Sequence, residues 1–295
     1  MKIAFWSIAN DKCNVSANMA AISVASVIRY PYSVIVLENH LRNSNLGRAY
    51  LRGERVDLKN EVGTNYYDGG GIEGLLRKIY RGSMNTDLLK SHLKEVIQEH
   101  LYYIPQTRVI HSEIFDYEFN YCVQTLFRLV EENADICFID TASSNNLSTK
   151  TILDESDLIV VNLCQDQGVL DDFFLNYSSL FSKSVFIISN YDSRLYLKYK
   201  RIAQMYQVPI EDIIPIPPNN LYQTAYLTGS VVEFVSGNYS SIKESPHYFY
   251  INSIKKATYL IIKKAAHLLK AKENAMISRF LVPFSILYSL GEYCI

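Results

Sequence analysis

The sequence predicts an α/β domain with a doubly wound, mostly parallel sheet and helices on both faces. Short, continuous apolar runs predict buried strands, because a strand covered on both faces lacks the alternation of a half-exposed one. Helical patterns lie between most of these runs, and no linker rich in proline, glycine or serine interrupts them. A hydrophobic content of 48% in 295 residues is ample for a large core.

The expected strands are apolar runs bounded by turn-forming residues. Their alternation with helices is typical of strand–helix–strand units in a parallel sheet. In chain order the runs are residues 3–6, 33–37, 102–104, 136–139, 158–163, 185–188 and 213–216.

Helical patterns lie between most of the expected strands. Residues 15–28 are apolar and small, residues 88–98 are amphipathic, and residues 117–132 run from an acidic start to a mixed end. Residues 43–83 are polar and have weak periodicity until residues 72–79. We interpret this stretch as a long excursion from the sheet, which is a partner-facing surface, a mobile lid or an ordinary surface loop with a short helix.

The end of the chain predicts a basic amphipathic helix followed by an apolar tail. From Ile251 onward the lysines lie largely off an apolar stripe at helical spacing. Either this helix docks on the sheet with a solvated face, or it contacts a membrane or partner. Residues 276–290 are too short to span a bilayer. They are apolar enough to lie in a membrane interface or to cover a dimer interface, and the alternative is a floppy tail. We divide the chain into a domain, residues 1–272, and a tail, residues 273–295.

Composition excludes several classes of protein. The formal net charge of −1 gives no global basic field, and we expect no nucleic-acid partner. The five cysteines are scattered and never form a CxxC pair, which argues against a disulfide scaffold or a zinc site and favours a reducing compartment. The N-terminus lacks the length and cleavage pattern of a signal peptide. We therefore expect a cytoplasmic protein.

The first candidate site is the loop between the first strand and the first helix. In a phosphate loop, glycines let backbone N–H groups turn inward at a helix N-terminus, where a lysine and the helix dipole hold phosphates. The residue after that lysine is a serine or threonine that binds magnesium. Lys12 has the right position, but the loop lacks glycine, Asp11 adds negative charge and Cys13 is a poor magnesium ligand. On these residues alone, a polar turn that caps a helix is the alternative.

Several motifs, in the correct order, resemble those of MinD/ParA-type ATPases over roughly residues 1–234. With Lys12 on the loop lysine, residues 16–20 resemble the start of the family's first helix. Residues 139–141 resemble the Walker B strand, and residues 188–192 resemble the strand that ends in asparagine near the adenine. The other matches are residues 38–40 at the family's Asp-x-Asp pair, 45–46, 101–105, 157–163, 216–217, 225 and 229–232.

The resemblance implies a P-loop NTPase fold of the SIMIBI class and is closest to divergent members such as TadZ-type localisation factors of pilus assembly. It also implies ATP and Mg²⁺ as cofactors, with a role for each matching residue. The implied cofactor-binding residues are Asn10, Asp11, Lys12, Cys13, Asn14 and Asn190. The implied metal ligands are Cys13 and, through water, Asp140, while Glu38 and His40 would take the catalytic role of placing the metal and the attacking water.

Departures from the family's pattern argue against fast ATP hydrolysis. His40 stands where relatives carry a carboxylate, and a neutral imidazole lacks that charge beside magnesium. Ser7 stands where relatives have the signature lysine that reaches the partner's nucleotide. Losing a cation of this kind typically lowers the rate on the order of 10³-fold.

We therefore expect a degenerate nucleotide-binding protein that acts as a positioning or regulatory factor, for a pilus or secretion assembly, with weak or no ATP hydrolysis. The implied partners are a second copy of the chain, proteins of a membrane-associated assembly, and the inner face of the membrane through peripheral contact. The alternatives are an active Mg-ATPase with a non-standard phosphate loop and a nucleotide-independent scaffold. An enzyme of another α/β class, with a different ligand at the strand ends, is a further alternative.

Overall fold

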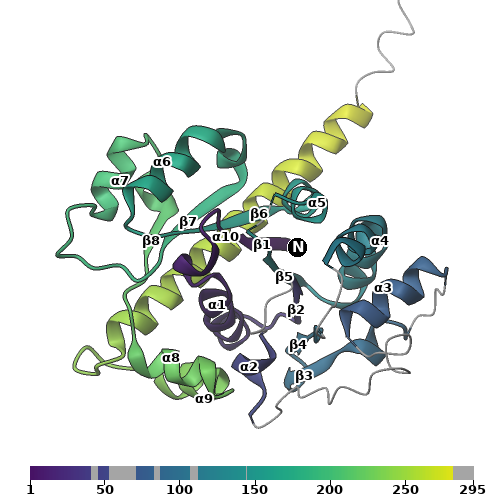
Figure 1. Ribbon diagram of the computed structural model, residues 1–295, viewed down its shortest axis with the longest axis horizontal. Coiled ribbons are helices and arrows are strands. Elements are labelled where there is room, and N and C mark those ends of the chain that lie inside the picture. The colour runs from purple at the N-terminus through teal and green to yellow at the C-terminus, as the bar shows by residue number, and fades with distance from the viewer. Residues whose placement is uncertain (41–45, 53–70, 83–86, 107–111, 144, 282–295) are drawn as a thin grey trace, which may run out of the picture.

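An eight-stranded sheet forms the centre of the molecule (Figure 1). The computed structural model describes residues 1–40, 46–52, 71–82, 87–106, 112–143 and 145–281, without the side chains of residues 10, 11, 273 and 275–281. The strand order is β3-β4-β2-β5-β1-β6-β7-β8, and every neighbouring pair is parallel except β3 and β4. The strands are β1 Lys2–Trp6, β2 Val34–Asn39, β3 Lys94–Ile97, β4 Leu101–Tyr103, β5 Ile136–Thr141, β6 Leu158–Leu163, β7 Ser184–Ile188 and β8 Ile213–Pro215.

Helices cover both faces of this sheet. One hydrophobic core lies between the sheet and α3 to α7, and the other lies between the sheet and α1, α2 and α8 to α10 (Figure 1). The helices are α1 Val15–Arg29, α2 Gly47–Tyr50, α3 Ile72–Tyr80, α4 Ser112–Asn133, α5 Leu147–Glu155, α6 Gln167–Asn176, α7 Tyr199–Met205, α8 Asn220–Leu227, α9 Val231–Asn238 and α10 Tyr248–Leu281. Short segments of 3-10 helix are η1 Asn10–Cys13, η2 Lys90–His92, η3 Ser178–Lys183 and η4 Ile210–Asp212.

The first strand shows why the apolar runs are continuous. Ile3 and Phe5 of β1 belong to one core, while Ala4 and Trp6 belong to the other. Successive side chains of a strand point to opposite faces, so a strand covered on both faces needs an apolar residue at every position. The structure confirms the predicted doubly wound, mostly parallel α/β fold.

The prediction of a helix over residues 88–98 is wrong. This segment contains η2 and then β3, which pairs antiparallel with β4 at the edge of the sheet. Leu88 and Leu89 are buried in one core, whereas Val96 and Ile97 pack against the other. A turn in which Glu99 has a φ of 60° reverses the chain and lets β3 pair. Tertiary pairing has therefore overridden the helical spacing of the apolar residues.

The polar excursion of residues 43–83 lies largely outside the described residues. Its described parts contain α2 and α3, and α3 confirms the helical periodicity of residues 72–79. The interpretation as a partner-facing surface or a lid stays a prediction.

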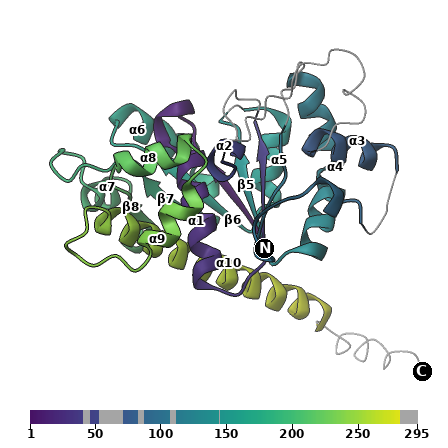
Figure 2. The same cartoon turned by 90° about the horizontal axis from the view of Figure 1, so that it is seen from below.

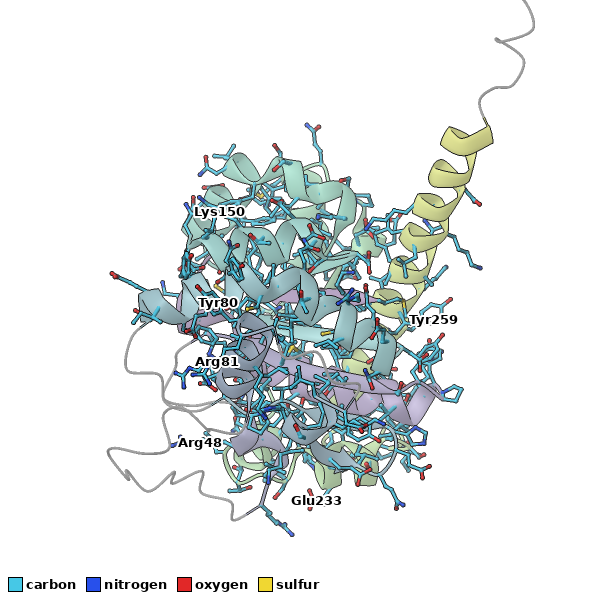
Figure 3. All side chains as sticks on the ribbon, turned by 90° about the vertical axis from the view of Figure 1, so that its right-hand side faces the viewer. Arg48, Tyr80, Arg81, Lys150, Glu233 and Tyr259 are labelled. Atoms are coloured by element: carbon cyan, nitrogen blue, oxygen red, sulfur yellow. The ribbon has the colours of Figure 1, made fainter. Side chains whose placement is uncertain are left out.

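The predicted basic helix is the first part of α10, and it docks on the domain. Ile254, Ile261 and Ala265 of its apolar stripe are fully buried against the core that also contains α1 and α9. Lys264 holds the helix to the sheet, because its Nζ lies 2.7 Å from Asp212 Oδ2 and donates to Ser184 O. The later turns of α10 extend past the rest of the domain (Figures 2 and 3).

The division of the chain at residue 272 stays a prediction, and α10 runs through that point to Leu281. Among the described residues, no helix combines the length and the apolar composition needed to cross a membrane.

Candidate functional site

The carboxyl ends of the parallel strands lie along one edge of the sheet, and the predicted site residues follow or occupy those ends. Lys12 follows β1, and Asn190 follows β7. Glu38 and His40 lie at the end of β2, and Asp140 lies at the end of β5, in register with Glu38. Open α/β sheets commonly bind ligands outside this edge.

The loop after β1 forms a compact turn. Asn10–Cys13 make the 3-10 turn η1, and Asn14 then adopts the left-handed conformation, with φ 48° and ψ 38°. Asparagine visits this conformation more readily than most other residues with a side chain. The Asn14 side chain does not cap α1, so it leaves the first N–H groups of that helix without its help. The side chains of Asn10 and Asp11 are outside the described part, and their phosphate contacts stay predictions.

Lys12 lies at the surface beside the start of α6. Its side chain is 68% exposed, and its Nζ lies 3.7 Å from Asp166 Oδ2. Asp166 caps α6 by accepting hydrogen bonds from the N–H groups of Gly168 and Val169. Exposed ion pairs of this kind typically contribute only about 0–1 kcal/mol. The lysine can therefore leave Asp166 for a phosphate at small cost.

Amide side chains tie the loop to the end of β7. Asn14 Nδ2 donates to Asn190 Oδ1 at 3.0 Å. About one turn further along the chain, the buried Asn18 of α1 donates to Asn162 Oδ1 at 2.9 Å and to Ser189 Oγ at 2.8 Å. Sequence reasoning did not assign the pair Asn18 and Asn162, although a polar residue in an apolar helix or strand signals a buried partner.

Cys13 lies beside a second thiol. It is fully buried, and its side chain contacts Ser7 and Cys164, which follows β6 and is partly exposed. A hydrogen bond from Cys13 lowers the pKa of Cys164 to about 7, and the same bond together with burial raises the pKa of Cys13. The backbone carbonyl of Cys13 accepts from Ser189 Oγ at 2.7 Å. The predicted role of Cys13 as a metal ligand stays a prediction.

Among the described cysteines, Cys164 is expected to react first with iodoacetamide, because the thiolate is the nucleophile. With a pKa of about 7, its labelling rate should rise about tenfold between pH 6 and pH 8. Mass spectrometry of peptides after a short exposure measures this rate. Burial raises the pKa of Cys122 to about 11 and that of Cys137 to about 12, so both serve as unreactive controls. An unchanged pH profile in Cys13→Ala would contradict the thiol pair.

Glu38, His40 and Asp140 form one buried cluster. Nε2 of His40 lies 3.0 Å from Asp140 Oδ2 and 3.3 Å from Glu38 Oε1, and the three side chains are at most 3% exposed. Glu38 also accepts from the backbone N–H of Leu46 at 2.8 Å and from the hydroxyl of Tyr103 at 2.6 Å. Burial raises the pKa of Glu38 to about 7, although the charge of His40 and these two hydrogen bonds act in the opposite direction.

Magnesium does not fit this cluster. Mg²⁺ demands octahedral oxygen ligands and usually keeps several waters. The nitrogen of His40 stands between the two carboxylates, and all three side chains are buried, so the cluster does not offer the all-oxygen, largely hydrated shell that Mg²⁺ prefers. Cys13, the other predicted ligand, is not part of this cluster among the described residues.

Comparison with known proteins shows which fold this is. A scan against models of protein families found no match, and a search of curated proteins found none either. Among solved structures, the ParA family ATPase of Chlorobium tepidum TLS matches with a TM-score of 0.66 and 15% identity, over 88% of this chain and 98% of that chain. MinD of Pyrococcus horikoshii OT3, complexed with Mg-ADP, matches with a TM-score of 0.63 and 15% identity, over 91% and 99%.

MinD of Aquifex aeolicus, in a complex with MinC, matches with a TM-score of 0.62 and 13% identity, over 89% of this chain and 95% of that chain. Identities this low establish a shared architecture, and the matches cover nearly the whole of both chains. The chain therefore has the fold of the MinD/ParA-type P-loop ATPases.

Proposed function

We propose that this protein is a nucleotide-binding positioning or regulatory factor of the MinD/ParA type, with weak or no ATP hydrolysis. The observation that carries the proposal is the MinD/ParA-type fold together with the sequence of β1, loop, Lys12 and α1 at the carboxyl edge of the sheet. ATP would place its phosphates at the N-terminus of α1, where backbone N–H groups and the helix dipole favour an anion.

Three groups around this edge would contact the nucleotide. Lys12 would exchange Asp166 for a phosphate, because its present ion pair is exposed and weak. Asn190 would bind the base, and Asn14 would couple it to the loop through their hydrogen bond. Asp140 and His40 would act on the phosphate side with Glu38, as the resemblance implies.

Weak hydrolysis follows from the charges near the loop. Phosphoryl transfer depends on cations that stabilise the developing negative charge. Ser7 is fully buried and carries no charge, and its Oγ accepts from the N–H of Ala9 at 3.1 Å. His40 supplies a nitrogen where Mg²⁺ needs oxygen, so Mg²⁺ is expected to add little to ATP affinity.

For partners, we propose a homodimer that binds proteins of a membrane-associated assembly, such as a pilus or secretion system. MinD of Aquifex aeolicus has been solved with a protein partner, MinC, which supports partner binding by this fold. The projecting end of α10 and the tail that follows would make peripheral contact with the inner face of the membrane (Figure 2).

Isothermal titration calorimetry with ATP, in the presence and absence of Mg²⁺, tests the nucleotide site. Lys12→Ala is expected to weaken ATP binding about tenfold or more, because a hydrogen bond to a charged group contributes about 1.5–3 kcal/mol. Lys90→Ala is the matched control, since Lys90 is 67% exposed and lies 3.4 Å from Asp87 Oδ1. This variant should bind ATP like the unmodified chain.

Different outcomes separate the alternatives. No ATP binding by the unmodified chain would refute the nucleotide-binding proposal and leave a nucleotide-independent scaffold. Steady phosphate release with Mg-ATP, abolished in Lys12→Ala, would show an active ATPase instead. Light scattering of the same samples reports whether ATP promotes dimerisation.

A further inference from the structure

The cluster of Glu38, His40 and Asp140 has the dimensions of a metal site. One possible ligand atom from each residue lies within 4.8 Å of the other two. The two distances from His40 Nε2 to the carboxylate oxygens are 3.0 Å and 3.3 Å. Ligand atoms about 2.0–2.2 Å from one ion, in tetrahedral or octahedral geometry, lie roughly 2.9–3.5 Å apart. The imidazole nitrogen is therefore at ligand spacing from each carboxylate, and the carboxylate oxygens, which lie within 4.8 Å of each other, can approach the same cation.

The choice of donor atoms selects the kind of cation. Carboxylate and water oxygens suit Mg²⁺, whereas imidazole nitrogen suits Zn²⁺ and other transition-series ions. We propose that Glu38, His40 and Asp140 bind a transition-series divalent cation such as Zn²⁺ directly, in place of Mg²⁺ and without nucleotide. The scattered cysteines do not bear on this site, because none of its ligands is a thiol.

The structure also supplies the surrounding contacts that a metal site requires. Ligating carboxylates are normally oriented by hydrogen bonds from groups behind them. The Tyr103 hydroxyl and the Leu46 N–H hold the two oxygens of Glu38, Oε2 and Oε1 respectively. Asp140 is fixed by the register of β5 with β2.

Charge balance favours a bound cation here. Glu38 and Asp140 are 0% and 1% exposed, and burying carboxylates is costly unless a positive group compensates them, while the one imidazole between them carries at most one positive charge. A dication on the shared side of the three ligands would neutralise both acids. This inference deepens the proposed function, because it names the cation of the same site, yet the cation would bind before any nucleotide.

Calorimetric titration of the full chain, after treatment with a chelator, tests this site with Zn²⁺ and with Mg²⁺ alone. We expect one Zn²⁺ per chain and no displacement by millimolar Mg²⁺. His40→Gln and Asp140→Asn should each weaken Zn²⁺ binding at least about 100-fold, because even loss of a second-shell partner costs 10–100-fold. His92→Gln is the matched control, since His92 is another buried histidine but contacts Lys78.

Circular dichroism first establishes that each variant is folded. If His40→Gln fails to fold, Asp140→Asn still tests the site, because asparagine keeps the shape of the aspartate side chain. Absence of Zn²⁺ binding to the unmodified chain would overturn the inference. Equal Zn²⁺ binding in Asp140→Asn and His92→Gln would also overturn it, because the ion would then lie elsewhere.

The same titrations separate this inference from the proposed function. Lys12→Ala is expected to lose ATP affinity while it keeps the Zn²⁺ site. ATP binding without Zn²⁺ binding would remove only the metal site, and Zn²⁺ binding without ATP binding would remove only the nucleotide-binding proposal.

Discussion

Replacing Phe173 with alanine is expected to lower the free energy of unfolding by about 3–5 kcal/mol, the usual cost of emptying a buried aromatic position. Phe173 of α6 is fully buried. Its ring centroid lies between 5.7 and 6.3 Å from those of Trp6, Tyr177, Phe181 and Phe186. The side chain thus joins α6 to β1, η3 and β7, and no single neighbour can fill the space that it leaves. Urea denaturation at equilibrium measures the loss.

The same helix offers a matched control. Leu175 is 75% exposed, and Leu175→Ala should change the free energy of unfolding by no more than about 0.5 kcal/mol. Similar losses in both variants would mean that the helix and not the aromatic cluster limits stability. Trp6 is the last residue of β1 and directly precedes the loop, so this packing also holds the strand end from which the candidate phosphate loop starts.

The central strands could be predicted because burial on both faces leaves a local record in the sequence. Residues 158–163 were expected as a strand and form β6 with the same bounds. The edge strand β3 left no such record. Its exposed positions, Lys94 and Glu95, and its apolar ones, Val96 and Ile97, fit a helix as well as a strand. Only the pairing of β3 with β4 decides between the two, and that pairing depends on a turn at Glu99.

The sequence could predict where the candidate site lies on the sheet, but not which side chains contact one another there. Residues at strand ends, such as Asp140, can be placed on one edge of a parallel sheet from the order of the strands. The hydrogen bonds of Asn18 to Asn162 and Ser189 span 144 and 171 positions of the sequence, so a local pattern can mark Asn18 as a buried polar residue but cannot identify its partners. His40 was recognised as a departure from a carboxylate, but its place between two buried acids required the structure.

Gly229→Ala is expected to destabilise the protein by about 2–5 kcal/mol, because two separate effects add. Gly229 has a φ of +73°, which typically costs a residue with a side chain about 1–2 kcal/mol. A Cβ at this position would also lie 2.6 Å from the carbonyl oxygen of Leu51 and 2.8 Å from the backbone N of Arg52. Crowding of this kind costs typically about 1–3 kcal/mol. Thermal or urea unfolding of the purified variant measures the sum.

Two other glycines separate these effects. Gly82 has a φ of +74° with open space around its Cβ position, so Gly82→Ala should show the backbone strain alone, about 1–2 kcal/mol. Gly237 lies in α9 with nothing near its Cβ position, and Gly237→Ala should stabilise the protein by up to about 1 kcal/mol. Equal losses for Gly229→Ala and Gly82→Ala would contradict the close approach. This order of stabilities would explain why residues 229–232 begin with glycine. The turn between α8 and α9 lies directly on the backbone that follows α2. At the start of α2, the N–H of Leu46 donates to Glu38 of the candidate site.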